Sequence, residues 1–300
     1  MEYIENLANN YPQLNKPIEL DIIIEGGLFN GMYSCGALLL IKQLERKKYF
    51  RVNRISGASI GSIMGYYYFT DTVNEFAKDF IDLRSSFQKD VHFHKIEEIA
   101  TNNLNKLDES KLELINDKLF ITYVKNGEET TQQHFESRDD LKRAILKSIQ
   151  IPYLTCNSFF REYGDDKYLD GGVPFIFNER TYKRDKYILY LNNSSVKTMF
   201  TVKNEINAHG RILEGALDAH NFFLHKNRGF LCSYIHEWNT QDFVVLRLKQ
   251  LMYKLLIVVC WFFYKNRDLF IYYFDKIYFF QEINSVFKNF IKDFILLKCL

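Results

Sequence analysis

The feature that most constrains the fold is an order of strand, glycine turn and helix that occurs twice in the first 70 residues. A β-branched run at 18–24 ends at Glu25-Gly26-Gly27, and the helical pattern "GMYSCGALLLIKQLERKK" starts at Gly31. A second run at 51–56 leads into another glycine turn, and a helical pattern without proline follows over 59–69. Strands that alternate with helices in this way form a parallel sheet with helical crossovers. The sequence therefore predicts an α/β fold.

Further along, the pattern predicts helices, a hairpin and short strands. Asn126-Gly127 between two alternating runs indicates a β-hairpin within 118–135. Ser137 is placed to cap a helix that extends to about Ile149. The remaining predicted elements are helical segments at 72–88, 94–117 and 204–226, two short strands within 159–172, and strands at 186–192 and 243–249.

The second glycine turn reads Gly57-Ala58-Ser59-Ile60-Gly61. A Gly-x-Ser-x-Gly pentapeptide alone is a weak signal, and an ordinary small-residue helix start is the alternative. A nucleophile elbow needs a strand before the serine, a helix after it and flanking glycines that keep side chains away from the turn. All three are present, and a helix N-terminus stabilises negative charge near the hydroxyl. Ser59 is therefore a candidate nucleophile.

The first glycine turn lies in "EGGLFNGMYSCGAL", residues 25–38. Glycines between a strand and a helix leave backbone N–H groups bare, and such groups bind anions. The dinucleotide fingerprint is not matched, because the third residue of "GGLFNG" is Leu28 and no acidic residue follows the next strand. Adjacent parallel strands would bring both glycine turns to one sheet edge. We therefore expect an oxyanion here rather than a nucleotide phosphate.

A third candidate is Asp170-Gly171-Gly172, at the end of a short predicted strand. A carboxylate followed by two glycines can approach another backbone closely, and it could act as general base for Ser59. The alternative for these three residues is a plain β-turn.

Together the three stretches resemble the patatin-like phospholipase family in order and spacing, over roughly residues 20–190. "GMYSCGALLL" and "SIQIPYL" also resemble segments of that family. The resemblance implies a three-layer αβα fold with a mainly parallel central sheet. It further implies lipid acyl hydrolysis of the phospholipase A or lysophospholipase type by a Ser–Asp dyad, without a catalytic histidine, a metal or an organic cofactor.

On this resemblance Ser59 attacks the ester carbonyl and Asp170 accepts its proton. The N–H groups of Gly26, Gly27 and Leu28 would hold the oxyanion. The family's loop usually reads Gly-Gly-Gly-x-Arg/Lys-Gly, whereas here Leu28 replaces the third glycine and Asn30 the basic residue. The remaining motif glycines are Gly31, Gly57, Gly61, Gly171 and Gly172.

Two other functions stay open. The altered loop "GGLFNG" supports a catalytically inactive patatin fold that acts as a lipid-binding or membrane-surface scaffold. An α/β-hydrolase triad would use Ser59, Asp170 and a histidine in the chain order that fold requires, but only two predicted strands precede Ser59. The candidate histidines for such a triad are His209, His220, His225 and His236.

Several classes of protein fit the sequence poorly. The net charge of +2 does not suggest a nucleic-acid partner. Five scattered cysteines without a Cys-x-x-Cys pair suit a reducing compartment. "VHFH" could present His92 and His94 on one face of a strand, but no third ligand is near in the sequence, so we expect no metal site. The N-terminal stretch lacks the basic and apolar blocks of a secretory signal.

We expect a cytoplasmic protein with a patatin-like domain at 18–195 and a mostly helical C-terminal extension at 196–300. The tail contains "LLIVVCWFFY" at 255–264, which is too short to cross a membrane, followed by "LFIYYFDKIYFF" and "FIKDFILLKCL". Aromatic, aliphatic and lysine residues mixed in this way are found both in core helices and in segments at a membrane interface. The expected partner is a lipid substrate at a membrane or micelle surface, so peripheral membrane contact stays open, and the sequence indicates no particular protein partner.

Overall fold

The computed structural model describes residues 2–90, 94–152, 154–156, 158–177, 186–194 and 209–266. Within these residues eight strands form one sheet in the order β5-β6-β3-β2-β1-β7-β8, and β4 pairs with β3. The strands are β1 (Ile18–Ile24), β2 (Phe50–Ala58), β3 (Leu119–Lys125), β4 (Glu128–Gln132), β5 (Arg161–Tyr163), β6 (Asp166–Asp170), β7 (Lys186–Leu191) and β8 (Cys232–Tyr234).

The centre of the sheet is parallel. β1 pairs in parallel with β2 and β7, and β2 pairs in parallel with β3, whereas β4, β6 and β8 are antiparallel to their neighbours. Ile24 is opposite both Gly57 and Leu191. The carboxyl ends of β1 and β2 therefore lie level, and the two glycine turns that follow them share one edge of the sheet, as expected from the sequence.

The helices are α1 (Glu2–Asn9), α2 (Gly31–Arg46), α3 (Ile60–Phe69), α4 (Val73–Asp90), α5 (His94–Asn105), α6 (Arg138–Ser148), α8 (His209–His225) and α9 (Thr240–Lys265). Three short 3-10 helices, η1 (Leu28–Asn30), η2 (Glu109–Leu114) and η4 (Ile235–Glu237), complete the described elements. The two predicted strand–turn–helix units and the 118–135 hairpin are confirmed. Ser137 caps α6, because its hydroxyl oxygen accepts the Asp140 N–H at 3.1 Å.

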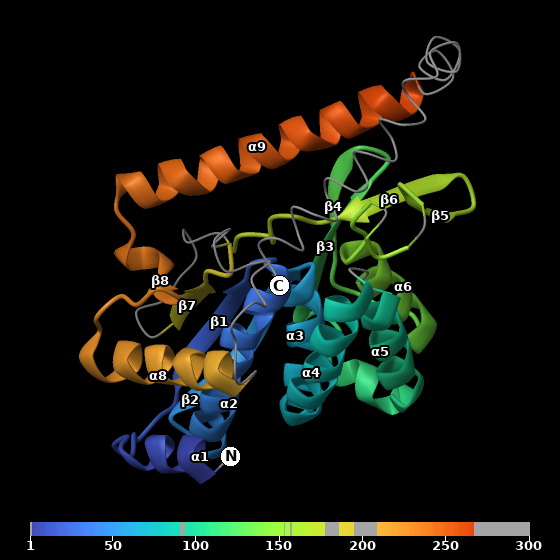
Figure 1. Cartoon of the computed structure of the whole chain (residues 1–300). Coiled ribbons are helices and arrows are strands. Elements are labelled where there is room, and N and C mark those ends of the chain that lie inside the picture. Colours follow the sequence, from blue (N-terminus) through green and yellow to red (C-terminus); the bar gives the residue numbers. More distant parts are fainter. Residues whose placement is uncertain are drawn as a thin grey trace.

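Helices cover the sheet on both faces, which gives three layers (Figure 1). On one face, α2, α3 and α8 pack on a core that includes Leu20, Ile22 and Ile55. On the other face, Ile23 and Tyr190 pack with Leu246 of α9. The fold is thus the expected three-layer αβα fold with a mainly parallel sheet.

The expected strand at 243–249 is wrong, because these residues belong to α9. The alternating, β-branched sequence "FVVLRLK" favours a strand, but Asn239 and Asp242 form a capping box just before it. That cap starts a helix, and the least exposed residues then recur at helical spacing, as with Leu246, Tyr253 and Ile257. None of the helices in the described ranges has the length and apolar character needed to cross a membrane.

α8 and β8 follow residue 195 and pack on α2 and β7. The division of the chain into 18–195 and 196–300 stays a prediction. The tail segments at 269–280 and 290–300 lie outside the described residues, as do residues 204–208 of the helix that was expected at 204–226.

Candidate active site

Ser59 lies on a sharp turn between β2 and α3. Its backbone φ of 55° and ψ of −128° place a non-glycine residue in a rarely occupied, strained conformation. The flanking glycines permit the turn: a Cβ at Gly57 would lie 2.3 Å from the Gly61 carbonyl carbon, and one at Gly61 would lie 2.3 Å from the Ile24 oxygen. The turn therefore has the geometry of a nucleophile elbow.

The three stretches that the sequence singles out meet at this edge. A Cβ at Gly26 would lie 3.1 Å from the Ser59 Cβ and 3.4 Å from the Gly172 oxygen. The glycine loop after β1, the serine turn after β2 and the Asp-Gly-Gly turn after β6 are thus in mutual contact, although residues 26 and 172 are far apart in the chain.

Asp170 is the last residue of β6, and its carboxylate faces Ser59. Oδ1 accepts the Gly172 N–H at 2.7 Å. Oδ2 is buried and has no closely aligned hydrogen-bond donor in the described part of the chain. Oδ2 is therefore available to take a proton.

Burial raises the pKa of Asp170 from 3.8 to about 6, and the Ser59 hydroxyl and the Gly172 N–H partly oppose this rise. The cause is desolvation, which disfavours the charged carboxylate. The residue as a whole keeps some exposed surface, while its Oδ2 is covered. A carboxylate with this pKa is still ionised at neutral pH but is a stronger base than an exposed aspartate.

The end of α6 holds both candidate residues. The Ser59 N–H donates to Ser148 Oγ at 3.0 Å, and the Ser148 hydroxyl donates to the Thr122 oxygen at 2.7 Å. Two residues later, the Gln150 oxygen accepts the Asp170 N–H at 2.8 Å. The sequence alone indicates no role for Ser148. Its one signal is its place at the start of "SIQIPYL", a segment that resembles the family.

The glycine loop has the bare N–H groups that an oxyanion needs. The N–H groups of Gly26, Gly27 and Leu28 make no hydrogen bond to any described residue. Leu28, in place of the family's third glycine, has a φ of 49°, in the left-handed region that glycine occupies without strain. The leucine therefore keeps a glycine-like backbone here, and its N–H is retained.

Asn193, which is 1% exposed, holds this loop from the end of β7. Its side-chain amide donates to the Glu25 oxygen at 2.9 Å, and its backbone oxygen accepts Asn30 Nδ2 at 2.7 Å. The buried Arg211 of α8 donates to Asn30 Oδ1 at 3.3 Å. A guanidinium thus contacts the side chain that replaces the family's basic residue. Neither Asn193 nor Arg211 was identified from the sequence, since only the tertiary fold brings them to the loop.

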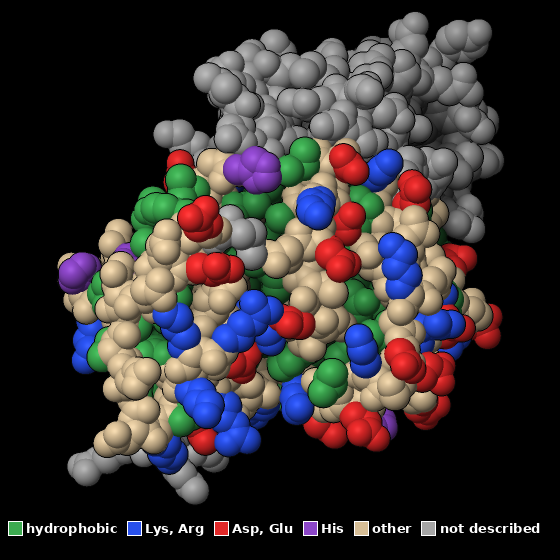
Figure 2. All heavy atoms as spheres, turned by 90° about the horizontal axis from the view of Figure 1, so that it is seen from below, with side chains coloured by type: hydrophobic (Ala, Val, Ile, Leu, Met, Phe, Trp, Pro, Cys, Tyr) green, Lys and Arg blue, Asp and Glu red, His purple; other side chains and the backbone are tan. Residues whose placement is uncertain are grey.

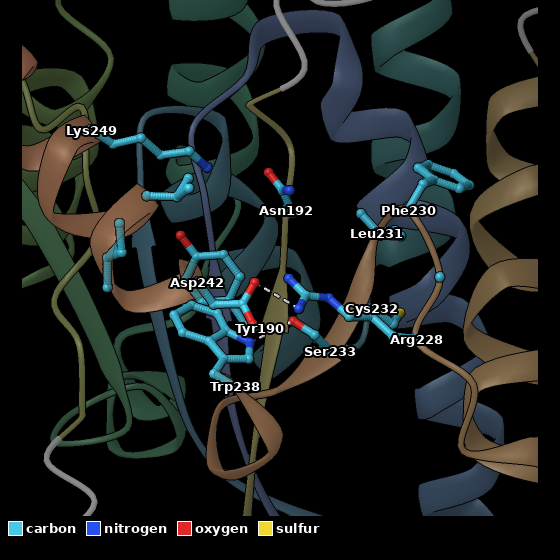
Figure 3. A pocket seen from close by; sticks show the side chains of 13 residues that line it. Tyr190, Asn192, Arg228, Phe230, Leu231, Cys232, Ser233, Trp238, Asp242 and Lys249 are labelled. Carbon is cyan, nitrogen blue, oxygen red and sulfur yellow. Dashed lines mark hydrogen bonds and ion pairs between the residues drawn. The ribbon is translucent and has the colours of Figure 1, made fainter. Parts of the chain in front are cut away.

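A small apolar pocket opens beside Ser59, with a volume of about 10 Å³. Its wall is almost entirely hydrophobic, but the volume holds only about one water molecule, so the pocket shows that Ser59 has apolar surroundings and is not an open acyl-chain site. A larger pocket of about 140 Å³ lies between β7, β8 and the start of α9, and neither Ser59 nor Asp170 lines it (Figure 3). The residues that line the small pocket are Leu28, Ser59, Ile60, Phe80, Leu83, Ile96, Ile149, Ile151 and Thr155.

The candidate triad histidines lie elsewhere. His209, His220 and His225 belong to α8 and His236 to η4. No hydrogen bond or ion pair joins any of them to Ser59 or Asp170 in the described structure, and the ring of His220 packs edge-on against Tyr11. This arrangement gives no support to a Ser–His–Asp triad.

His94 is the first residue of α5, as the predicted helical segment at 94–117 implies, so the strand arrangement considered for His92 and His94 is not present at His94. His92 lies outside the described residues. Within the described ranges, no group of three or more His, Cys, Asp and Glu side chains is placed to hold a metal ion.

Comparison with known proteins agrees with this architecture. The sequence model of the patatin-like phospholipase family matches residues 22–176, which is more than half of the chain. The matched range contains both glycine turns, Ser59 and Asp170. No curated protein matches the chain. On the family match and the fold, the chain belongs to the patatin-like phospholipase family.

Proposed function

We propose that this protein hydrolyses acyl esters of lipids with a Ser59–Asp170 dyad. The observation that carries the proposal is the contact between three separate turns, which puts Ser59, the Asp170 carboxylate and the bare N–H groups around Gly26 at one point. Family membership supports lipid acyl hydrolysis as the general activity. The dyad and the phospholipase A or lysophospholipase type are the specific parts of the proposal.

In the first half-reaction Asp170 takes the proton of the Ser59 hydroxyl while Ser59 Oγ bonds to the ester carbonyl carbon. The N–H groups of Gly26, Gly27 and Leu28 hold the negative oxygen that forms. The bond from carbon to the leaving oxygen then breaks, and the departing alcohol takes the proton from Asp170. This leaves an acyl-enzyme on Ser59.

In the second half-reaction a water molecule gives a proton to Asp170 and attacks the acyl carbon. The bond to Ser59 Oγ breaks, Ser59 recovers the proton, and the carboxylic acid leaves. Asp170 therefore accepts a proton and gives it back in each half-reaction. A pKa of about 6 favours both steps at neutral pH, because the carboxylate is ionised and is a stronger base than an exposed aspartate.

The surroundings of Ser59 support an apolar acyl group as the group that is transferred, because hydrocarbon side chains such as Ile60, Phe80 and Ile149 lie beside it; the small pocket between them must widen to admit a long chain. A substrate of this kind resides in a membrane or micelle. Peripheral association of a cytoplasmic protein with such a surface is therefore part of the proposal.

The inactive-scaffold alternative rests on the altered loop, with Leu28 and Asn30 at the changed positions. Two observations favour the enzyme. Leu28 keeps a bare N–H for the oxyanion, and the Arg211 guanidinium contacts Asn30, so a positively charged group is still present at the changed position.

Release of fatty acid from a panel of phospholipids, lysophospholipids and neutral glycerides tests the proposal. We expect the wild-type protein to release fatty acid from at least one class and Ser59→Ala to release none. A folded wild-type protein that leaves every lipid intact, with detergent or vesicles present, would favour the scaffold.

A further inference from the structure

We infer that the outer face of α9 is a docking surface for an anionic lipid bilayer. The inference rests on the proposed function for its purpose, but its test measures binding and does not require catalysis. The outer face consists of Phe243, Val244, Val245, Leu248, Leu251, Met252, Leu255, Leu256, Val258, Val259 and Phe262.

These side chains are apolar and in contact with water. Each keeps between 37% and 64% of its surface exposed, and all belong to one helix of 26 residues. Single exposed apolar side chains are common on protein surfaces. A continuous exposed apolar face along one helix instead indicates a binding surface for a membrane, a ligand or another protein.

The charges on α9 beyond Asp242 have one sign. Arg247, Lys254 and Lys265 are exposed, and 243–266 contains no acidic residue. Burial raises the pKa of Glu129 of β4 and the charge of Lys254 partly opposes that rise, so Glu129 lies near Lys254 and offsets part of its positive charge. By contrast, the face seen from below in Figure 2 carries interspersed basic and acidic side chains.

The exposed apolar side chains and the positive charge together indicate what binds to the outer face. Cationic side chains among exposed aliphatic and aromatic ones fit a bilayer whose headgroups are negative and whose interior is apolar. Two copies of the same face would instead bring positive charges together. The charge pattern therefore favours a lipid surface over a second copy of this chain.

The inner face of α9 fixes the helix to the active-site turns. The Tyr253 hydroxyl donates to the Asp170 backbone oxygen, and its ring lies so close to Gly172 that a Cβ there would be 2.3 Å from it. Lys249, at the edge of the pocket in Figure 3, donates to Glu25 Oε1 at 2.9 Å, next to the glycine loop. A bilayer bound to the outer face would thus lie on α9, the helix whose inner face contacts Asp170 and Glu25 beside the glycine loop.

Vesicle flotation with the full chain tests the inference, using phosphatidylcholine vesicles with and without phosphatidylglycerol. We expect wild-type protein to float with the mixed vesicles and to float less at high salt, because the cationic contribution is screened. The double variant Leu248→Asp, Leu255→Asp should reduce binding by about tenfold or more, since it places two carboxylates in the apolar face. The double variant Leu213→Asp, Leu224→Asp is the matched control, because both are exposed leucines on α8 and the variant adds the same two carboxylates.

Binding that the α9 variant loses and the α8 control keeps, with both variants folded, supports the inference. Equal binding of all three proteins, or no binding of wild-type protein to either vesicle, overturns it. A wild-type dimer that the α9 variant breaks, without vesicle binding, assigns the face to a second copy and also overturns it. Labelling of Ser59 by a soluble fluorophosphonate without vesicles should be equal in all three, so failure of the catalytic proposal is seen separately.

Discussion

The Ser59 turn and α9 both contact the end of β6, but they are held in different ways. α3, which follows the turn, buries every residue from Ile60 to Tyr68. α9 buries only a stripe that includes Leu246 and Ile257. Packing on all sides fixes the geometry of a reacting group, whereas attachment along one stripe leaves the other side of a helix to meet a second surface. Substitutions in the two regions should therefore differ in their effect on stability.

Gly57→Ala should give the largest loss of stability. The added Cβ would lie 2.3 Å from the Gly61 carbonyl carbon, so backbone must move. We expect the free energy of unfolding to fall by about 3 kcal/mol in urea denaturation. Gly210→Ala is the control, because a Cβ there meets nothing within 4 Å. Equal stability of the two variants would mean that the elbow is not tightly packed.

Ser148→Ala should lower both stability and turnover. It removes the acceptor of the Ser59 N–H and leaves that N–H buried without a partner. We expect a loss of about 2 kcal/mol and a lower kcat with little change in KM. Ser137→Ala removes the cap of the same helix and should cost about 1 kcal/mol without lowering kcat. A similar kcat in both variants would contradict a positioning role for Ser148.

Asp170→Asn should make the protein more stable at neutral pH while removing activity. The pKa in the folded state, about 6, is above the ordinary value of 3.8, so the native protein loses stability as pH rises through that interval. Asparagine has no charge to bury, so we expect it to raise the free energy of unfolding by about 1 to 3 kcal/mol at pH 7.5 and by little near pH 4. Urea denaturation at both pH values measures this difference, and equal gains at both would contradict the cause assigned to the pKa.

Leu28→Gly should change which esters are cleaved. It removes a left-handed leucine, which relieves about 1 kcal/mol of strain, and it clears one wall of the pocket beside Ser59. We expect the ratio of kcat/KM for long to short acyl esters to rise. Leu28→Ala shortens the side chain but keeps the strain, so it should share the change in selectivity and not the gain in stability. Unchanged selectivity in both variants would show that Leu28 does not contact the acyl group.

Leu251→Ser, on the outer face of α9, should give the smallest change in stability. Leu251 is 61% exposed, so the free energy of unfolding should change by less than about 0.5 kcal/mol. A loss comparable to that of Gly57→Ala would show that this face is covered in the folded protein.

The sequence predicted the elements whose structure depends on neighbouring residues in the chain. The β1–α2 and β2–α3 units were predicted because strand period, glycine turns and helix period follow one another without interruption. The 243–249 segment was assigned wrongly because its alternation looked like a strand, while the Asn239 cap made it a helix.

The hydrogen bonds that hold the candidate site together could not be predicted from the sequence, because they join residues that are far apart in the chain. Ser148 reaches Ser59 across 89 positions, Asn193 reaches Asn30 across 163, and Arg211 reaches Asn30 across 181. A single sequence carries no signal for such pairs. The substitution at Asn30 looked like the loss of a positive charge, whereas the structure places the Arg211 guanidinium in contact with that side chain.

Labelling of the purified protein with a fluorophosphonate tests the central claim most directly, with Ser59→Ala and Asp170→Asn beside the wild type. The account predicts that wild-type protein is labelled, that Ser59→Ala is not, and that Asp170→Asn is labelled much more slowly because the base is lost. It also predicts that the rate of labelling falls as pH drops through about 6, where Asp170 takes up a proton. Labelling that persists in Ser59→Ala, or equal rates in wild type and Asp170→Asn, would contradict the dyad.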